Sequence, residues 1–269
     1  MKSFFTFVLS VFIIFLSHNS GKAQDFEVSP AKLLFSAEPG QTQTISLIVR
    51  NHSSQKCAFK IEQGDFGVNM EGKKTQLPLR SSNRSIADWL TTSPSFFEIQ
   101  PNDQVSVNVS VKIPADGVST RWGFLSVQTV RERTSIDVDK NISTGITISP
   151  RIVVYVIQSP KSNTNAKAKI HSLKEITTEK DTLRAFEAMV DNIGDKIAQC
   201  KIYLLTTHLG NREEKEFPPI KVEVFPESSQ LIKLKLPKNM PKGKYALAAV
   251  LDYGSKYSLE GTQIIINYE

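Results

Sequence analysis

Apolar and polar residues alternate along most of this chain, and short clusters of turn residues interrupt the alternation. A period of two is typical of half-buried β-strands, and clusters such as Glu38-Pro39-Gly40-Gln41 are typical of turns. In the first half of the chain the pattern predicts strands over residues 26–35, 42–49, 57–63, 96–99, 105–113, 121–130 and 144–157. The first strand is expected to be broken or bent at Pro30. Seven or so short strands, with a turn about every 8–12 residues, indicate an all-β sandwich.

Two stretches depart from this alternation. Residues 64–84 are polar and serine-rich without a clear period, so we expect a long loop or an irregular edge there. Residues 159–168 are polar throughout and predict a linker. Strands are then predicted over 169–173, 183–190, 198–206, 220–224, 231–236, 245–251 and 263–268. The fold class is therefore expected to be all-β, with two immunoglobulin-like β-sandwich domains at residues 24–158 and 169–269.

The first 23 residues have the pattern of an export signal. Lys2 supplies the positive start, residues 4–16 form the apolar core, and Gly21-Lys22-Ala23 provides the small-residue end. The apolar run of about 13 residues is too short for a comfortable membrane span, and no other stretch reaches roughly 18 apolar residues. We therefore expect a soluble, exported protein that does not span the membrane.

Charge and cysteine content exclude some classes of function. The formal net charge is +6, but it is spread along the chain without a run of five or six like charges. Nucleic acid is therefore not expected as a partner, whereas an anionic envelope surface remains open. A disulfide between Cys57 and Cys200 requires Cα atoms within about 7 Å, and the two residues lie in different predicted domains. We expect two buried, reduced thiols.

The residues that could carry chemistry are scattered. His52, His171 and His208 are isolated in sequence, with no His-x-x-x-His or Cys-x-x-Cys spacing, and no phosphate loop or nucleophile elbow is present. Asp137 and Asp139 lie in a charged loop without the further ligands of a calcium site. The sequence therefore predicts no enzyme, no metal and no cofactor, and an unclassified hydrolase is only a third alternative.

The stretch from residue 144 to 157 is the strongest candidate for an interaction. Ile146 and Ile148 lie on one face of a predicted strand, and Pro150, which cannot donate to a ladder, belongs at an edge, bulge or kink. An edge strand with a row of isoleucines aggregates unless something covers it, and a partner's strand is one such cover. The alternative is that both isoleucines pack into their own sandwich.

Four stretches carry a family resemblance. Residues 26–35 hold a basic residue three positions before an aromatic one, and residues 45–54 form a strand that ends in an asparagine turn. Residues 113–127 hold a proline–aspartate turn before an aromatic strand, and residues 151–160 form a strand that ends in proline. Together they resemble the first domain of the PapD-like periplasmic chaperones of pilus assembly. The second domain resembles only a generic immunoglobulin-like module.

The resemblance implies a boomerang of two sandwiches that holds a pilin- or adhesin-like envelope subunit in the periplasm. An edge strand would lend alternate apolar side chains to the subunit, and two basic residues in the cleft would anchor its C-terminal carboxylate. Lys32 fits the first anchor, or is a solvated lysine at a strand end. The second anchor falls on Val153 or Tyr155, so Arg151 is only the nearest cation. The candidate partner-binding residues are Lys32, Ile146, Ile148, Arg151, Ile152 and Val154.

A second resemblance supports an alternative function. Residues 26–30, 38–44 and 145–150 are also similar to the extracellular sandwich of WxL-interacting surface proteins. Those proteins bind peptidoglycan and partner proteins, and they usually carry a C-terminal membrane segment, which is not seen before Glu269. We therefore expect a chaperone-like protein that escorts an envelope protein by edge-strand pairing. The alternative is an envelope scaffold or adhesion component of a surface or secretion machine.

Overall fold

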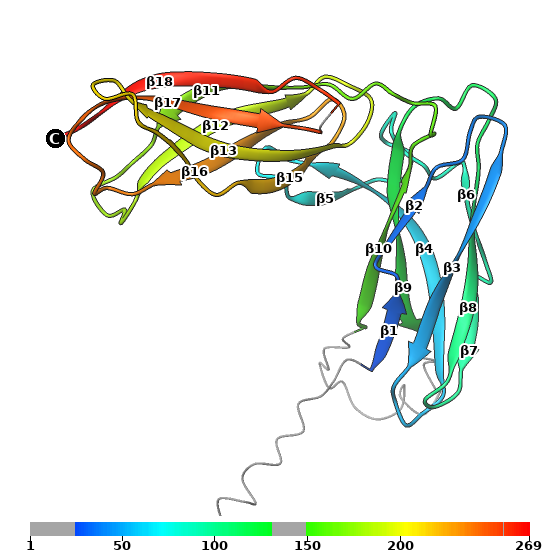
Figure 1. Ribbon diagram of the computed structural model, residues 1–269. Helices are drawn as coiled ribbons and strands as arrows, with labels where there is room; N and C mark the ends of the chain where they lie inside the picture. The colour runs from blue at the N-terminus through cyan, green and yellow to red at the C-terminus, as the bar shows by residue number, and fades with distance from the viewer. Residues whose placement is uncertain (1–24, 131–148, 255) are drawn as a thin grey trace, which may run out of the picture.

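The strands in the described part of this chain form four sheets, which make up two sandwiches joined in an L shape (Figure 1). The computed structural model describes residues 25–130, 149–254 and 256–269. No helix that could cross a membrane occurs in these parts of the chain. The prediction of an all-β fold is confirmed.

Ten strands of the N-terminal sandwich lie in the described residues. They are β1 (Phe26–Ser29), β2 (Lys32–Phe35), β3 (Thr42–Asn51), β4 (Cys57–Val68), β5 (Lys74–Leu77), β6 (Leu90–Ser93), β7 (Phe96–Ile99), β8 (Gln104–Lys112), β9 (Arg121–Val130) and β10 (Arg151–Gln158). One sheet has the order β1-β3-β8-β6, and the other has the order β2-β10-β9-β4-β5, with β7 also paired to β4. The alternate apolar residues of both sheets meet in one core, in which Leu47, Val107 and Val127 are fully buried.

The chain changes sheets between β1 and β2. β1 pairs antiparallel with β3, whereas β2 pairs parallel with β10, and Pro30 lies between them. Because proline cannot donate to a ladder, it interrupts the pairing at this point. The predicted interruption of the first strand at Pro30 is confirmed as a break.

The described residues of the C-terminal sandwich form eight strands. They are β11 (Ala168–Glu175), β12 (Arg184–Asn192), β13 (Ala198–His208), β14 (Glu214–Glu216), β15 (Ile220–Val224), β16 (Ser229–Leu236), β17 (Gly243–Asp252) and β18 (Glu260–Tyr268). Its sheets have the orders β11-β12-β16 and β14-β13-β17-β18, with β15 also paired to β13. Phe186, Ile202 and Leu247 are fully buried between them.

A hairpin forms in the first part of the stretch 64–84, for which a long loop or an irregular edge was predicted. β4 continues to Val68, and β5 returns antiparallel to it, with Lys74 opposite Val68. The side chain of Asn69 accepts hydrogen bonds from two main-chain N–H groups of the turn, and Gly72 has a φ of 76°. The prediction of a loop was wrong for residues 64–77, because β5 is mostly exposed and shows no alternation of apolar residues. β5 does lie at the edge of its sheet, and residues 78–84 belong to no strand.

The β4–β5 hairpin (residues 66–77) reaches the C-terminal sandwich (Figure 1). The main-chain N–H of Leu231 donates to the carbonyl of Met70 at 2.7 Å. Phe66 at the base of the hairpin packs against Trp122 and against Phe225 of the C-terminal sandwich, with ring centroids 6.5 and 5.7 Å away. The buried guanidinium of Arg84 adds ion pairs to Asp195 and Glu227.

Candidate partner-binding site

The strand β10 has an edge that is only half paired. β9 pairs with all of β10 on one side, from Arg151 to Gln158. On the other side, β2 pairs only from Tyr155 onwards. Within the described residues, Arg151–Val154 are therefore paired with no strand on that side, over a length of about 13 Å. Unpaired N–H and C=O groups in such a row are a template for another strand.

The side chains of β10 point alternately into the core and towards the C-terminal sandwich. Val154 is fully buried in the N-terminal core, and Ile152 is half-buried against it. The side chains of Val153 and Tyr155 point the other way, onto the aromatic cluster of Phe66, Trp122 and Phe225. The N–H of Tyr155 donates to the carbonyl of Ala31 on the β2 side, and main-chain groups alternate sides along a strand. The main-chain groups of Ile152 and Val154 therefore point to β9, and those of Arg151 and Val153 point to the open side.

The remaining candidates lie in different places. Ile146 and Ile148 are outside the described residues. Arg151 is exposed at the start of β10, and its guanidinium donates to the amide oxygen of Gln76 on β5 at 3.4 Å. The structure thus places Arg151 on the edge strand itself, facing the hairpin.

Lys32 makes an ion pair between the two sandwiches. It is the first residue of β2 and lies opposite Tyr155 on β10. Its Nζ is 2.7 Å from Oε1 of Glu223, which belongs to β15 in the C-terminal sandwich. The same oxygen accepts a hydrogen bond from Gln199 at 3.0 Å. Lys32 is therefore not a freely solvated lysine at a strand end, which was the alternative from the sequence.

A second lysine, which sequence reasoning missed, lies near the same carboxylate. Nζ of Lys74 is 4.8 Å from the ring centroid of Tyr155 and 5.7 Å from that of Phe225. Burial alone raises the pKa of Glu223, but hydrogen bonds from Lys32 and Gln199 and the charges of both lysines outweigh it. The pKa of Glu223 is therefore below its ordinary value of 4.5. Only the basic pair Lys73-Lys74 after a glycine marked this position in the sequence, and such pairs are common on surfaces.

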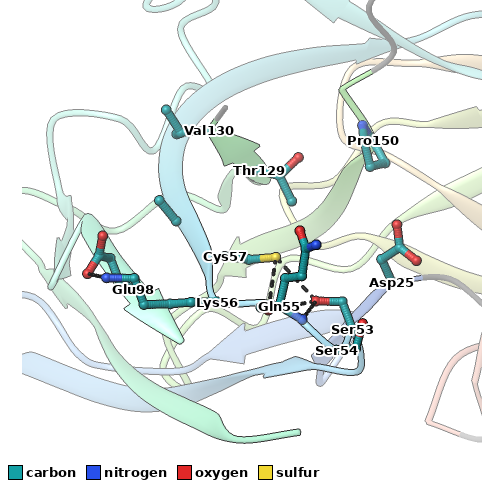
Figure 2. Close-up of a pocket in the computed structure, with 11 residues that line it drawn as sticks. Asp25, Ser53, Ser54, Gln55, Lys56, Cys57, Glu98, Thr129, Val130 and Pro150 are labelled. Carbon is teal, nitrogen blue, oxygen red and sulfur yellow. Dashed lines mark hydrogen bonds and ion pairs between the residues drawn. The ribbon is translucent and has the colours of Figure 1, made fainter. Parts of the chain in front are cut away.

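A hollow of about 620 Å³ lies at the opposite end of the N-terminal sandwich (Figure 2). Cys57 lines it, with its Sγ 3.4 Å from Oγ of Ser53, and Lys56 is paired with Glu98 at 2.7 Å. No histidine is among the residues that line the hollow. Among the described residues that line the hollow, the Cys57 thiol therefore has no neighbouring histidine of the kind that activates a cysteine nucleophile.

The other titratable side chains do not gather into a site. His52 pairs with Glu27 at 3.1 Å, and His171 pairs with Asp191 at 3.0 Å in the other sandwich. Among the residues with described positions, no group of three His, Cys, Asp or Glu could hold a metal ion. Both cysteines are free, as predicted, but Cys57 is only half-buried. Burial, with the charge of Asp252, raises the pKa of the Cys200 thiol to about 12.

Comparison with known proteins finds solved structures that resemble this fold. No family model and no curated protein matches the sequence. Among solved structures, a chain of a chaperone–tip adhesin complex of CFA/I fimbriae biogenesis is 14% identical, with a TM-score of 0.50 over 90% of this chain and 98% of that one. The class 5 fimbriae chaperone CfaA is 13% identical, with a TM-score of 0.49 over 89% of this chain and 98% of that one. The first likeness confirms the fold that the PapD-like resemblance implied.

Proposed function

We propose that this protein is a non-enzymatic periplasmic chaperone that binds a pilin- or adhesin-like envelope subunit through the edge of β10. The observation that carries the proposal is the edge at Arg151–Val154, which no strand of the described residues pairs on the β2 side. This edge belongs to a fold shared with a chain of a chaperone–tip adhesin complex. In strand addition, main-chain hydrogen bonds supply affinity and alternating side chains supply specificity.

The surroundings of the edge favour a strand as the ligand. β9 pairs with the opposite side of β10 along its whole length, and the side chain of Val154 is buried in the core. The edge is therefore already in the extended geometry that a second strand requires, so little ordering entropy is lost on binding. Ile146 and Ile148 are the proposed source of side-chain specificity, because they precede the edge in the same strand pattern. Lys32 is the proposed anchor for the carboxyl terminus of the subunit.

The test is affinity purification of the tagged protein from its native envelope, followed by mass spectrometry. The parent is compared with a variant that carries Ile146→Asp and Ile148→Asp. A matched control is Ile265→Asp, because Ile265 is an isoleucine on β18 of the other sandwich that is 60% exposed. We expect one small β-rich subunit with the parent and with the control, and its loss with the double variant, since charges at these positions cannot enter an apolar groove.

The opposite result identifies the alternative. Equal recovery of the subunit with the double variant contradicts edge-strand binding. Recovery of large machine components or peptidoglycan with all three proteins supports an envelope scaffold instead.

A further inference from the structure

The junction between the sandwiches already holds a carboxylate next to two cations. The N-terminal sandwich supplies Lys32 from β2 and Lys74 from the β4–β5 hairpin, and the C-terminal sandwich supplies Glu223 from β15. The charges of both lysines lower the pKa of Glu223. Lys32 lies opposite Tyr155, the residue that directly follows the open edge of β10. A carboxylate site therefore adjoins the proposed strand-binding edge.

We propose that Glu223 is an internal competitor, which occupies in the free protein the position that a partner's carboxylate takes in the complex. Lys74, from the hairpin, supplies the second positive charge that the last strand of the sandwich lacks. This inference rests on the proposed function, and it adds a regulatory element to the same site.

The exposure of the groups makes the exchange feasible. The side chains of Lys32 and Glu223 are 35% and 32% exposed, so solvent and a ligand can reach the pair. An ion pair that is this exposed contributes little free energy. When the partner's carboxylate replaces Glu223 at Lys32, the number of charged groups does not change. Gln199, which bonds to the same oxygen, remains in the C-terminal sandwich as a partner for the displaced Glu223.

The junction does not depend on the Lys32–Glu223 pair. The guanidinium of Arg84, 11% exposed, binds Asp195 and Glu227, and the main-chain N–H of Thr120 also donates to Asp195. The aromatic cluster around Phe225 joins the sandwiches independently of these charges. Release of Glu223 therefore leaves the two sandwiches in place.

The experiment measures binding of a small carboxylate to the isolated chain, residues 24–269, by nuclear magnetic resonance of the lysine ε-methylene groups. The probe is acetyl-Val-Phe with a free carboxyl group, and its carboxamide serves as the uncharged comparison. Glu223→Gln is compared with the wild type and with Glu98→Gln, a matched control because Glu98 forms a 2.7 Å pair with Lys56 far from the junction.

We expect the acid to bind Glu223→Gln about two- to fivefold more tightly than the wild type, the range that loss of a half-exposed ion pair permits. The signals of Lys32 and Lys74 should shift with the acid and not with the amide. Addition of Lys74→Gln should remove the gain in affinity. Equal affinities for wild type and Glu223→Gln, or equal binding of acid and amide, would overturn the inference.

A second measurement needs no variant. Saturation of the wild type with the acid should raise the pKa of Glu223 towards its ordinary value, because the Glu223 carboxylate then moves away from Lys32 and Lys74. An unchanged pKa would contradict displacement. Both measurements use only the isolated chain and a small probe, so their failure leaves the edge-strand proposal to be decided by the purification experiment.

Discussion

Arg184 holds Glu175 with two nitrogens, with Nε 2.9 Å from one carboxylate oxygen and the terminal nitrogen 2.7 Å from the other. The hydrogen bond from Arg184 is the largest influence on the carboxyl group, and burial opposes it. The net effect lowers the pKa of Glu175 below its ordinary value of 4.5. Two parallel hydrogen bonds fix this pair more firmly than a single contact between flexible side chains would.

A folded-state pKa below the unfolded value implies acid-sensitive stability. The contribution of Glu175 is fully present above about pH 4.5 and is lost as the pH falls through the lower, folded-state pKa. Glu175→Gln should therefore lower the free energy of unfolding by about 1 kcal/mol at pH 7, with the difference shrinking below pH 4. Urea unfolding across this range measures it. The exposed Glu179 provides a control as Glu179→Gln, and a difference that is independent of pH would count against this account.

Lys32 and Lys74 show which contacts could not be predicted from the sequence. Lys32 was found because a basic residue before an aromatic one in a first strand is a local pattern. Its partner Glu223 is 191 residues away in sequence, and their contact depends on how the two sandwiches meet. Lys74 was missed because it lies on a strand without apolar alternation. Long-range contacts between polar residues leave no periodic signal.

At the scale of elements, the run from Ile152 to Ile157 was correctly predicted as a strand. Its side chains could not be assigned to faces, because both faces carry apolar residues. The structure buries Val154 and Val156 in the core, while Val153 and Tyr155 contact the aromatic cluster. A continuous β-branched run thus predicts the strand but not which residues point towards a partner.

The assignment of faces can be tested by stability. Val154→Ala should lower the free energy of unfolding by about 2 kcal/mol, because it leaves a cavity at a fully buried site. Val153→Ala, at a half-buried site, should cost about 1 kcal/mol or less. Urea unfolding of the purified variants measures both costs. The reverse order would show that the two faces of β10 have been exchanged.

At the scale of the whole molecule, the angle between the sandwiches depends on residues from loops and strand ends. Phe225 packs against Trp122 with ring centroids 5.1 Å apart, and it is almost fully buried. Arg84 lies in a segment that the sequence predicted only as a loop or irregular edge. The sheets follow from alternation, but the arrangement of the two sandwiches does not, because its contacts are few and distant in sequence.

Phe225→Ala should loosen this arrangement. Removal of the ring deletes the central member of the cluster, so the sandwiches should sample a wider range of angles. Small-angle X-ray scattering should show a larger radius of gyration and a larger maximum dimension. Ile232→Ala, inside the C-terminal sandwich, is the control and should leave both quantities unchanged. An unchanged scattering profile for Phe225→Ala would mean that Arg84 and the hairpin suffice to hold the angle.

The switch of the chain from β1 to β2 also fixes the register of anything that pairs with β10. A strand laid along Arg151–Val154 cannot slide further, because β2 occupies the edge from Tyr155 onwards. Lys32, the first residue of β2, stands at that boundary. In the proposed complex, a bound segment would therefore have to turn or terminate where β2 begins, at Lys32. A shift of the register by one residue would move every side chain of the bound strand to its other face. The position of β2 would therefore determine which side chains of the partner face the chaperone.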